Sequence, residues 1–264
     1  MKKIIVVTGA SSGMGRQFTI QIDKKEKVDE IWVISRNKKH LEELKNSVST
    51  KIVPISIDLT DREQIKKKYL TRLKTEKPEV KILANCAGFG IFDHTENIDT
   101  DILTNMIDLN VTACVALISY TLPFMKKGSK IMNISSCASF QPIPYINCYA
   151  ATKAFVTSYS RALRKEVKYR GIHVLTVTPF WTKTRFFDRA IDSNKKKVVV
   201  NYAAMYDPAK VIKKAIKDLY RNKEISCYGF VNNGQKILVH LLPKKLVMSI
   251  WAKSQKLDGT PKIR

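Results

Sequence analysis

The feature that most constrains the fold is an alternation of short aliphatic runs with amphipathic stretches. Predicted strands, most of them rich in valine and isoleucine, lie at residues 3–8, 31–35, 51–57, 80–85, 130–135 and 173–178, with 225–228 as a candidate seventh strand at the edge. Predicted helices lie between them at residues 15–26, 39–48, 62–75, 101–125 and 149–169. Because most strands are apolar on both faces, we expect an α/β fold: a doubly wound parallel sheet of about seven strands with helices on both faces.

Length and composition fit a single domain over residues 1–264, with 44% hydrophobic residues to supply its core. Residues 180–207 are irregular and aromatic, which predicts a substrate lid. Residues 235–255 alternate apolar clusters with lysines, which predicts an amphipathic C-terminal extension broken at Pro243.

Cysteine usage and hydropathy disfavour several classes of protein. The five cysteines lack paired spacing, so we expect reduced thiols in a cytoplasmic protein, with neither disulfides nor a metal site. The four aliphatic residues after Lys3 are too few for a secretory signal. We also expect no membrane span, since no window approaches about 18 uninterrupted apolar residues.

The formal net charge of +24 comes mostly from lysines spread over predicted helix faces and loops. Since they form no single stripe interleaved with aromatics, we expect no nucleic-acid partner. A solvated surface explains most of this charge. It is also compatible with attraction of an anionic ligand, such as a phosphorylated cofactor or a coenzyme A thioester.

A glycine-rich turn joins the first predicted strand to the first helix. Glycines let such a turn close tightly and let the backbone approach a pyrophosphate at the helix N-terminus. This position in a strand–helix–strand unit therefore indicates a Rossmann-like dinucleotide site. The turn residues expected at the cofactor are Gly9, Ser11, Ser12, Gly13, Met14 and Gly15.

The end of the second strand, Ser35-Arg36, bears on the choice of dinucleotide. The acidic residue that would bind the ribose 2′-hydroxyl of NAD is absent, and a guanidinium suits a 2′-phosphate. This favours NADP(H) over NAD(H), the alternative being that Arg36 only solvates a turn. Asp58 is expected to accept a hydrogen bond from the adenine amine, whereas Asp61 has the position of a helix N-cap.

Tyr149 and Lys153 are expected to form the chemical centre. Four residues apart on a helix, they share one face, and a nearby cation lowers the pKa of a tyrosine from its usual value of about 10. Tyr206 and Lys210 repeat the spacing. Asp207-Pro208 directly after Tyr206 is typical of a helix start, so we interpret that second pair as structural.

These motifs, in this order, resemble the short-chain dehydrogenase/reductase family, main single-domain subfamily, over roughly residues 3–184. The glycine turn, Asn85-Cys86-Ala87-Gly88, Asn110 within Leu-Asn-Val, Ser136 and Tyr149-x-x-x-Lys153 carry the resemblance. The tail Leu-Leu-Pro-Lys-Lys-Leu-Val-Met-x-Ile-Trp is similar to that of long-chain 3-oxoacyl and 17β-hydroxysteroid reductase relatives.

The resemblance implies a catalytic tetrad. Tyr149 would be the general acid in reduction and the base in oxidation, and Ser136 would polarise the substrate carbonyl. Lys153 would lower the tyrosine pKa and bind the nicotinamide ribose. Asn110 would hold, through its backbone, a water linking Lys153 to solvent. Preorganised donors at the developing alkoxide lower the barrier to hydride transfer.

The resemblance also extends the cofactor site to Leu59, Asn85, Ala87, Gly88, Pro179, Thr182 and Thr184, together with Tyr149 and Lys153. One departure is Phe180, which stands where the family usually has glycine after Pro179. A side chain there implies a displaced cofactor loop or a narrowed pocket.

The expected substrate is a bulky, hydrophobic ketone or secondary alcohol of the hydroxysteroid or 3-oxoacyl type. The residues expected around it are Ser136, Phe140, Tyr145, Phe180, Trp181, Phe186 and Phe187. Alternatives are a reductase of small aldehydes or ketones and a catalytically silent NADPH-binding regulator. By analogy we expect a homodimer or homotetramer paired through residues 101–125 and 149–169. The tail is expected to make a weak peripheral membrane contact or to pack at a subunit interface.

Overall fold

The computed structural model describes residues 1–187, 199–202 and 204–257. A seven-stranded parallel sheet, in the order β3-β2-β1-β4-β5-β6-β7, forms its centre. This confirms the predicted doubly wound sheet, including the short edge strand. The strands are β1 (Lys3–Thr8), β2 (Glu30–Ser35), β3 (Lys51–Ser56), β4 (Glu79–Asn85), β5 (Lys130–Ile134), β6 (His173–Val177) and β7 (Ile225–Ser226).

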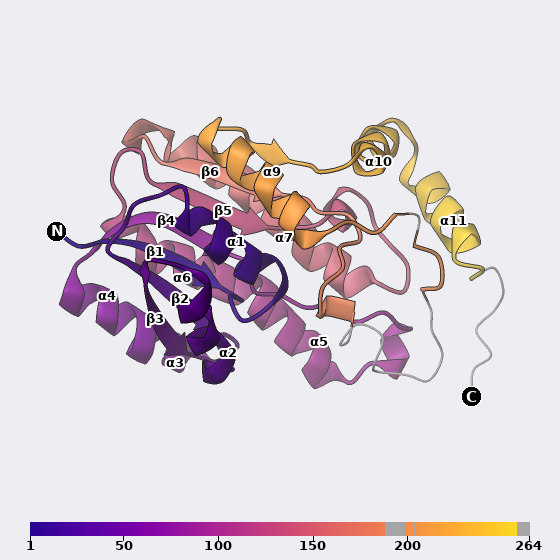
Figure 1. Ribbon diagram of the computed structural model, residues 1–264. Helices are drawn as coiled ribbons and strands as arrows, with labels where there is room; N and C mark the ends of the chain where they lie inside the picture. Colours follow the sequence, from indigo (N-terminus) through magenta and orange to yellow (C-terminus); the bar gives the residue numbers. More distant parts are fainter. Residues whose placement is uncertain (188–198, 203, 258–264) are drawn as a thin grey trace.

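Helices cover both faces of this sheet (Figure 1). One face carries α1 (Gly13–Asp23), α2 (Lys38–Glu42) and α9 (Pro208–Tyr220). The other carries α4 (Thr71–Glu76), α6 (Ala113–Thr121) and α7 (Asn147–Glu166). Short π-helical turns join α3 (Arg62–Gln64) to α4 and α5 (Thr100–Ile107) to α6, so each pair forms one continuous helix.

The core has two layers because successive side chains along each strand point to opposite faces of the sheet. In β1, Ile4 and Val6 pack into the cluster under α4, α6 and α7, while Ile5 and Val7 pack under α1, α2 and α9. All four side chains are fully buried. A strand buried on both faces needs apolar residues throughout, which explains why the strands read as continuous aliphatic runs.

Within the described residues, one helix, Thr100–Phe124, is long and apolar enough to cross a membrane, with a mean hydropathy of 1.6 over its most apolar window. It passes by length and mean composition alone: Asn105, Asp108 and Asn110 interrupt it, so it contains no run of 18 uninterrupted apolar residues. In the structure α5 packs on α7 and α6 packs on β4. The helix is apolar on two sides, since Leu117 and Ile118 are buried in the core while Ile102 and Ile107 are exposed.

Two further helices, α10 (Phe230–Leu241) and α11 (Lys244–Ser254), lie beyond the carboxyl ends of the strands, far from the N-terminus (Figure 1). Pro243 separates them, as predicted. The buried Asn232 fastens α10 to the sheet by donating from Nδ2 to the Thr178 carbonyl at 2.7 Å.

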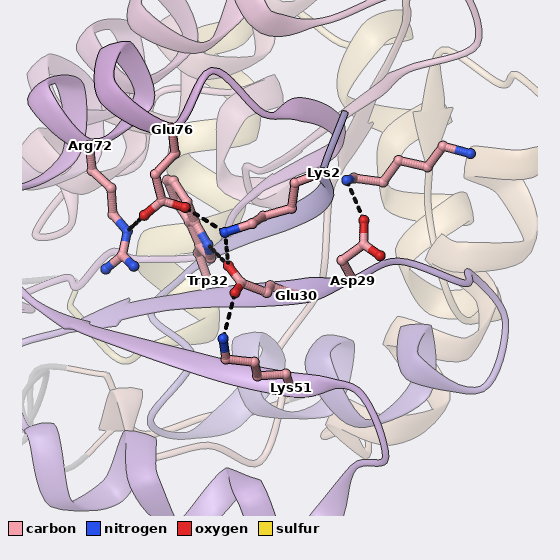
Figure 2. A network of polar contacts seen from close by, with 8 residues as sticks. Lys2, Asp29, Glu30, Trp32, Lys51, Arg72 and Glu76 are labelled. Atoms are coloured by element: carbon pink, nitrogen blue, oxygen red, sulfur yellow. Dashed lines mark hydrogen bonds and ion pairs between the residues drawn. The ribbon is translucent and has the colours of Figure 1, made fainter.

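A charged network ties the amino end of β1 to β2, β3 and α4 (Figure 2). The Glu30 carboxylate, only 6% exposed, accepts from Lys51 at 2.8 Å, Lys2 at 3.2 Å and the Trp32 indole at 2.9 Å. Lys2 also pairs with Glu76 at 2.7 Å. Burial alone would raise the pKa of Glu30, but the three donors outweigh it and lower the pKa to about 2.

We therefore expect Glu30→Gln to lower the free energy of unfolding by about 1–3 kcal/mol at pH 7, allowing for screening at the exposed lysines. The folded pKa lies below the unfolded value of about 4.5. The stabilisation is thus complete above that pH and is lost as the pH falls towards 2. Urea unfolding at pH 7 and pH 3 measures it. Glu63→Gln, in an exposed surface ion pair, is the control and should leave the free energy of unfolding almost unchanged. An equal loss of stability in the two variants would refute the role of Glu30.

Candidate active site

The structure brings Ser136 and Tyr149 together at the carboxyl end of the sheet. Ser136 follows β5, and Tyr149 lies in the first turn of α7. Both side chains line the same cavity, and they lie close enough for the Ser136 hydroxyl to influence the pKa of Tyr149. Ser136 Oγ accepts from the Ala138 N–H at 3.1 Å, which fixes the side chain, while its own proton is directed only at the weak acceptor Cys137 Sγ, 4.0 Å away.

Lys153 lies one helical turn after Tyr149 and is only 4% exposed. Its Nζ donates to the Ile134 carbonyl at 3.0 Å and lies 5.7 Å from the centre of the Tyr149 ring. Burial lowers the pKa of Lys153 to about 8. A group with that pKa is still mainly cationic at pH 7, so the site contains a buried positive charge beside the phenol.

The pKa of Tyr149 differs from the sequence-based expectation. Burial raises the pKa of Tyr149 above its ordinary value, and the Ser136 hydroxyl acts in the opposite direction. Lys153 does not contribute to this shift. Desolvation penalises the phenolate more than the Ser136 hydroxyl stabilises it. Tyr149 is thus held as a protonated phenol, the form that a general acid requires.

Asn110 lies in the π-helical turn between α5 and α6 and is almost fully buried. Its Oδ1 accepts from the Phe89 N–H at 3.1 Å, and its Nδ2 donates to the Phe89 carbonyl at 2.9 Å. It therefore clamps the loop after β4 beside Lys153. A Cβ added to Gly88 would lie 2.9 Å from Asn110 Oδ1 and 3.2 Å from Lys153 Nζ, so only glycine fits between them.

A cleft of about 820 Å³ runs along the carboxyl ends of β1, β2, β3 and β4. It contains the glycine turn, and at one end it meets the cavity that holds Ser136 and Tyr149. The residues shared by cleft and cavity are Met14, Cys86, Gly88, Thr184 and Phe186. The Ser136 and Tyr149 side chains therefore lie in a cavity that opens onto the cleft.

The glycine turn fits a pyrophosphate. Gly9 has φ +63°, and a Cβ on Gly15 would lie 2.4 Å from the Gly9 carbonyl oxygen, so neither position accepts a side chain without strain. Ser12 at the N-cap makes no side-chain capping bond within the described residues. The first-turn residues of α1 line the cleft, and the Ser12 side chain does not occupy their N–H groups, so these groups are available to an anion.

The far end of the cleft contains Ser35, Arg36, Asp58 and Leu59, as expected for an adenosine site. It also contains Asn37, His40 and Thr60, which the sequence analysis missed because they belong to no motif. Asp58 accepts from the Thr60 N–H and hydroxyl at 3.0 and 2.8 Å, which orients its carboxylate. The end of the cleft is thus polar and carries one guanidinium.

The second cavity, of about 330 Å³, is mostly apolar. Four of the predicted aromatics line it, namely Phe180, Trp181, Phe186 and Phe187, together with Phe92, Ile143 and Ile146. The Tyr149 ring lies 5.3 Å from that of Phe186. An apolar molecule in this cavity would therefore have its reactive end at Ser136 and Tyr149.

A family model described as short chain dehydrogenase matches residues 3–195. The chain belongs to the short-chain dehydrogenase family. It is 33% identical over 186 residues to Hydroxysteroid dehydrogenase-like protein 1 of Gallus gallus, which covers 68% of this chain and 56% of that protein. It is 31% identical over 196 residues to Very-long-chain 3-oxoacyl-CoA reductase-A of Danio rerio, covering 69% and 59%. The chain thus matches less than two thirds of the length of these curated relatives.

Among solved structures, the chain resembles a short-chain dehydrogenase from Sphingobium yanoikuyae in complex with NADPH. The TM-score is 0.72 at 21% identity, over 99% of this chain and 98% of the other. At this identity the likeness concerns the fold, and it confirms the Rossmann-like arrangement.

Three sequence-predicted site residues lie elsewhere in this short-chain dehydrogenase. Phe140 packs against His240 of α10, with ring centres 5.8 Å apart, outside the apolar cavity. Tyr145 adopts φ +67°, and its ring contacts His94, with centres 4.6 Å apart. Asn85 does not line the cleft, because its buried Nδ2 donates to Asn133 Oδ1 at 2.9 Å across the sheet. We therefore correct all three assignments.

Of the residues expected at the cofactor, Pro179 and Thr182 line the apolar cavity and not the cleft, whereas Thr184 lies where the two meet. Tyr206 is structural, as interpreted: its backbone bridges Thr182, and Asp207 caps α9 with Pro208 at the first turn. Residues 188–198 and 203 of the expected lid lie outside the described part of the chain.

The C-terminal extension also forms part of the cavity wall, a contribution that was not predicted from the sequence. Trp251 on α11 stacks on Trp181 with ring centres 6.5 Å apart, and its Nε1 donates to the Pro144 carbonyl at 3.1 Å. Gln255 Oε1 accepts from the N–H groups of Val200 and Asn201 at 3.0 and 2.9 Å. The only signal for this contact was the apolar clusters of the tail.

Two glutamines supply polar atoms to this apolar wall. The Oε1 atoms of Gln141 and Gln235 are buried and have no hydrogen-bond partner in the described structure. Buried polar atoms are normally paired, so such an atom in a ligand-sized cavity indicates contact with a polar group of the ligand or with water.

Proposed function

We propose that this chain is an NADP(H)-dependent oxidoreductase that interconverts a hydrophobic ketone and its secondary alcohol. One observation carries the proposal: the hydroxyl-bearing side chains of Ser136 and Tyr149 line one apolar cavity, where that cavity meets a dinucleotide-sized cleft. From these two positions both hydroxyls can donate to one substrate oxygen.

The bound nicotinamide would supply the hydride that the carbonyl carbon accepts. Tyr149 donates its phenolic proton to the carbonyl oxygen in reduction and takes it back in oxidation. Ser136 donates a hydrogen bond to the same oxygen. A donor aimed at developing negative charge in a desolvated site lowers the barrier more than it would in water.

Lys153 and Asn110 support the proton transfer. In the resting site burial governs the pKa of Tyr149, but the Lys153 cation, 5.7 Å from the centre of the ring, would attract the negative charge that forms on the phenol during proton donation. Asn110 holds the loop after β4 against Lys153 through its two hydrogen bonds with Phe89. The π-helical turn around Asn110 alters the backbone hydrogen bonding of the helix, as a backbone-held water linked to Lys153 requires.

The cofactor preference rests on Arg36 at the end of β2. We expect Arg36→Gln to raise the KM for NADPH about 10–100-fold and to leave that for NADH nearly unchanged, because one charge-assisted phosphate contact is lost. Initial rates with each dinucleotide measure the effect. Arg221→Gln, beyond the end of α9, is the control. Equal increases for NADPH and NADH in Arg36→Gln would refute a 2′-phosphate contact.

The substrate class follows from the apolar cavity and from the relatives. The names of the two curated relatives point to hydroxysteroids and long 3-oxoacyl thioesters. The amides of Gln141 and Gln235 suit a substrate that also carries a polar group away from its carbonyl. The net charge of +24 favours an anionic carrier such as a coenzyme A thioester.

A turnover screen tests the proposed function. Purified protein with NADPH is offered ketosteroids, 3-oxoacyl thioesters and small aldehydes, and oxidation of the nicotinamide is followed by absorbance. We expect turnover with at least one of the two bulky classes and little with small aldehydes. NADPH binding without turnover on the whole panel would contradict the proposal and favour a regulatory NADPH-binding protein.

We also propose that the chain forms homo-oligomers through residues 101–125 and 149–169, and that it is located in the cytoplasm. Exposed Ile102, Ile107 and Phe155 on α5 and α7 support the first.

A further inference from the structure

Helix α10 has an apolar stripe that points away from the rest of the molecule. Phe230, Ile237 and Leu241 are 93%, 63% and 75% exposed. Their spacing of seven and four residues places them on one side of the helix. Asn232 and Val239, on the opposite side, are 0% and 3% exposed and hold the helix to the protein. The apolar stripe is therefore exposed because α10 packs against the protein through its opposite side.

The stripe continues onto α11, where Leu246 and Ile250 are about half exposed while Val247 is buried. We call the combined surface the outer face. It consists of Phe230, Val231, Ile237, Leu238, Leu241, Leu246 and Ile250. Single exposed apolar residues are ordinary, but a run of seven on two consecutive helices indicates an interaction site.

The charge around the outer face has one sign. Residues 225–257 contain Lys236, Lys244, Lys245, Lys253 and Lys256 and no aspartate or glutamate. An apolar face bordered by lysines is the pattern of helices that lie in the interface of an anionic membrane. If this face packed against a second copy of the chain, the lysines of the two copies would face each other. No acidic residue between 225 and 257 would neutralise them.

We propose that the outer face docks on an anionic lipid surface. The apolar side chains enter the boundary between headgroups and acyl chains, and the lysines contact lipid phosphates and carboxylates. Figure 1 shows α10 and α11 together at the end of the molecule, beyond the carboxyl ends of the strands.

The same two helices wall the apolar cavity, through Val231 and Gln235 of α10 and Trp251 of α11. Docking would therefore bring the cavity close to the lipid, so that a membrane-partitioned substrate reaches Ser136 and Tyr149 with little exposure to water. This last step rests on the proposed function, whereas the docking itself does not.

Vesicle flotation tests the docking without any turnover measurement. The full chain is mixed with phosphatidylcholine vesicles, with or without phosphatidylserine, at low and high salt. We expect binding to the anionic vesicles that weakens with salt. Ile237→Gln/Leu241→Gln should weaken it about tenfold or more, by removing inserted apolar area. Lys245→Gln/Lys253→Gln should weaken it by a similar factor.

Two controls separate the outer face from general basic charge. Lys213→Gln/Lys217→Gln on α9 removes the same charge elsewhere, and Tyr169→Gln removes an 88% exposed aromatic in the short turn that follows the carboxyl end of α7. Both should bind as the unsubstituted protein does. Equal weakening in the controls, or no vesicle binding at all, would overturn the proposal. So would a change from dimer to monomer on Ile237→Gln/Leu241→Gln without vesicle binding, which would assign the face to a subunit interface.

Discussion

Tyr149→Phe is expected to lower kcat by about 10²–10⁴-fold, the usual contribution of a positioned general acid. The substitution removes one oxygen from a buried ring that packs against Phe186, so the fold and the cavity shape should persist. Dissociation constants for NADPH should stay within a few-fold, because no cofactor contact depends on protonation of the phenol. Single-turnover rates and NADPH fluorescence titration separate the two effects.

Tyr206→Phe is the matched control for this experiment, since Tyr206 has the same spacing to a lysine. Its ring packs on Phe180 and Tyr228 at the far side of the loop after β6. Turnover should be unchanged in this variant. A comparable loss of kcat in both variants would assign the Tyr149 effect to packing rather than to proton transfer.

Gly15→Ala is expected to weaken NADPH binding about 10–100-fold and to lower kcat/KM in proportion. The added Cβ would lie 2.4 Å from the Gly9 carbonyl oxygen and 2.7 Å from its carbon, so the turn must open. Forcing an extra methyl into a tight site costs about 1–3 kcal/mol, which corresponds to that loss of affinity. Isothermal titration with NADPH measures it directly.

Gly234→Ala on α10 is the control for the glycine prediction. Nothing lies within 4 Å of the position its Cβ would take, and alanine is the better helix former. NADPH affinity should therefore be unchanged and thermal stability equal or higher. Unchanged NADPH affinity in Gly15→Ala as well would show that the turn is not the pyrophosphate site.

The sheet and the cofactor turn were predictable because their signals are local. Apolar strands such as Ile4–Val7 must be buried on both faces, and a turn such as Gly9–Gly15 must admit backbone close to backbone. The site pattern of Asn110, Ser136, Tyr149 and Lys153 was predictable only as a set. Each residue type is common alone, and their order along the chain gave the specificity.

The apolar cavity was predicted less well because tertiary packing builds it. Phe140 and Tyr145 lie near the site in sequence, but they turn towards α10 and His94. Trp251, more than 100 residues after Tyr149, completes the wall instead. The pKa of Tyr149 was also missed, since burial depends on neighbours from β5, α7 and the loop after β6 that no local pattern reveals.

A double-mutant cycle on Ser136 and Tyr149 tests the central claim most directly. If both hydroxyls serve one substrate oxygen, Ser136→Ala and Tyr149→Phe each lower kcat/KM, and the double variant is little worse than the worse single variant. We predict this non-additivity with NADPH affinity retained in all three variants. Strictly multiplicative losses, or full activity in either single variant, would contradict the account.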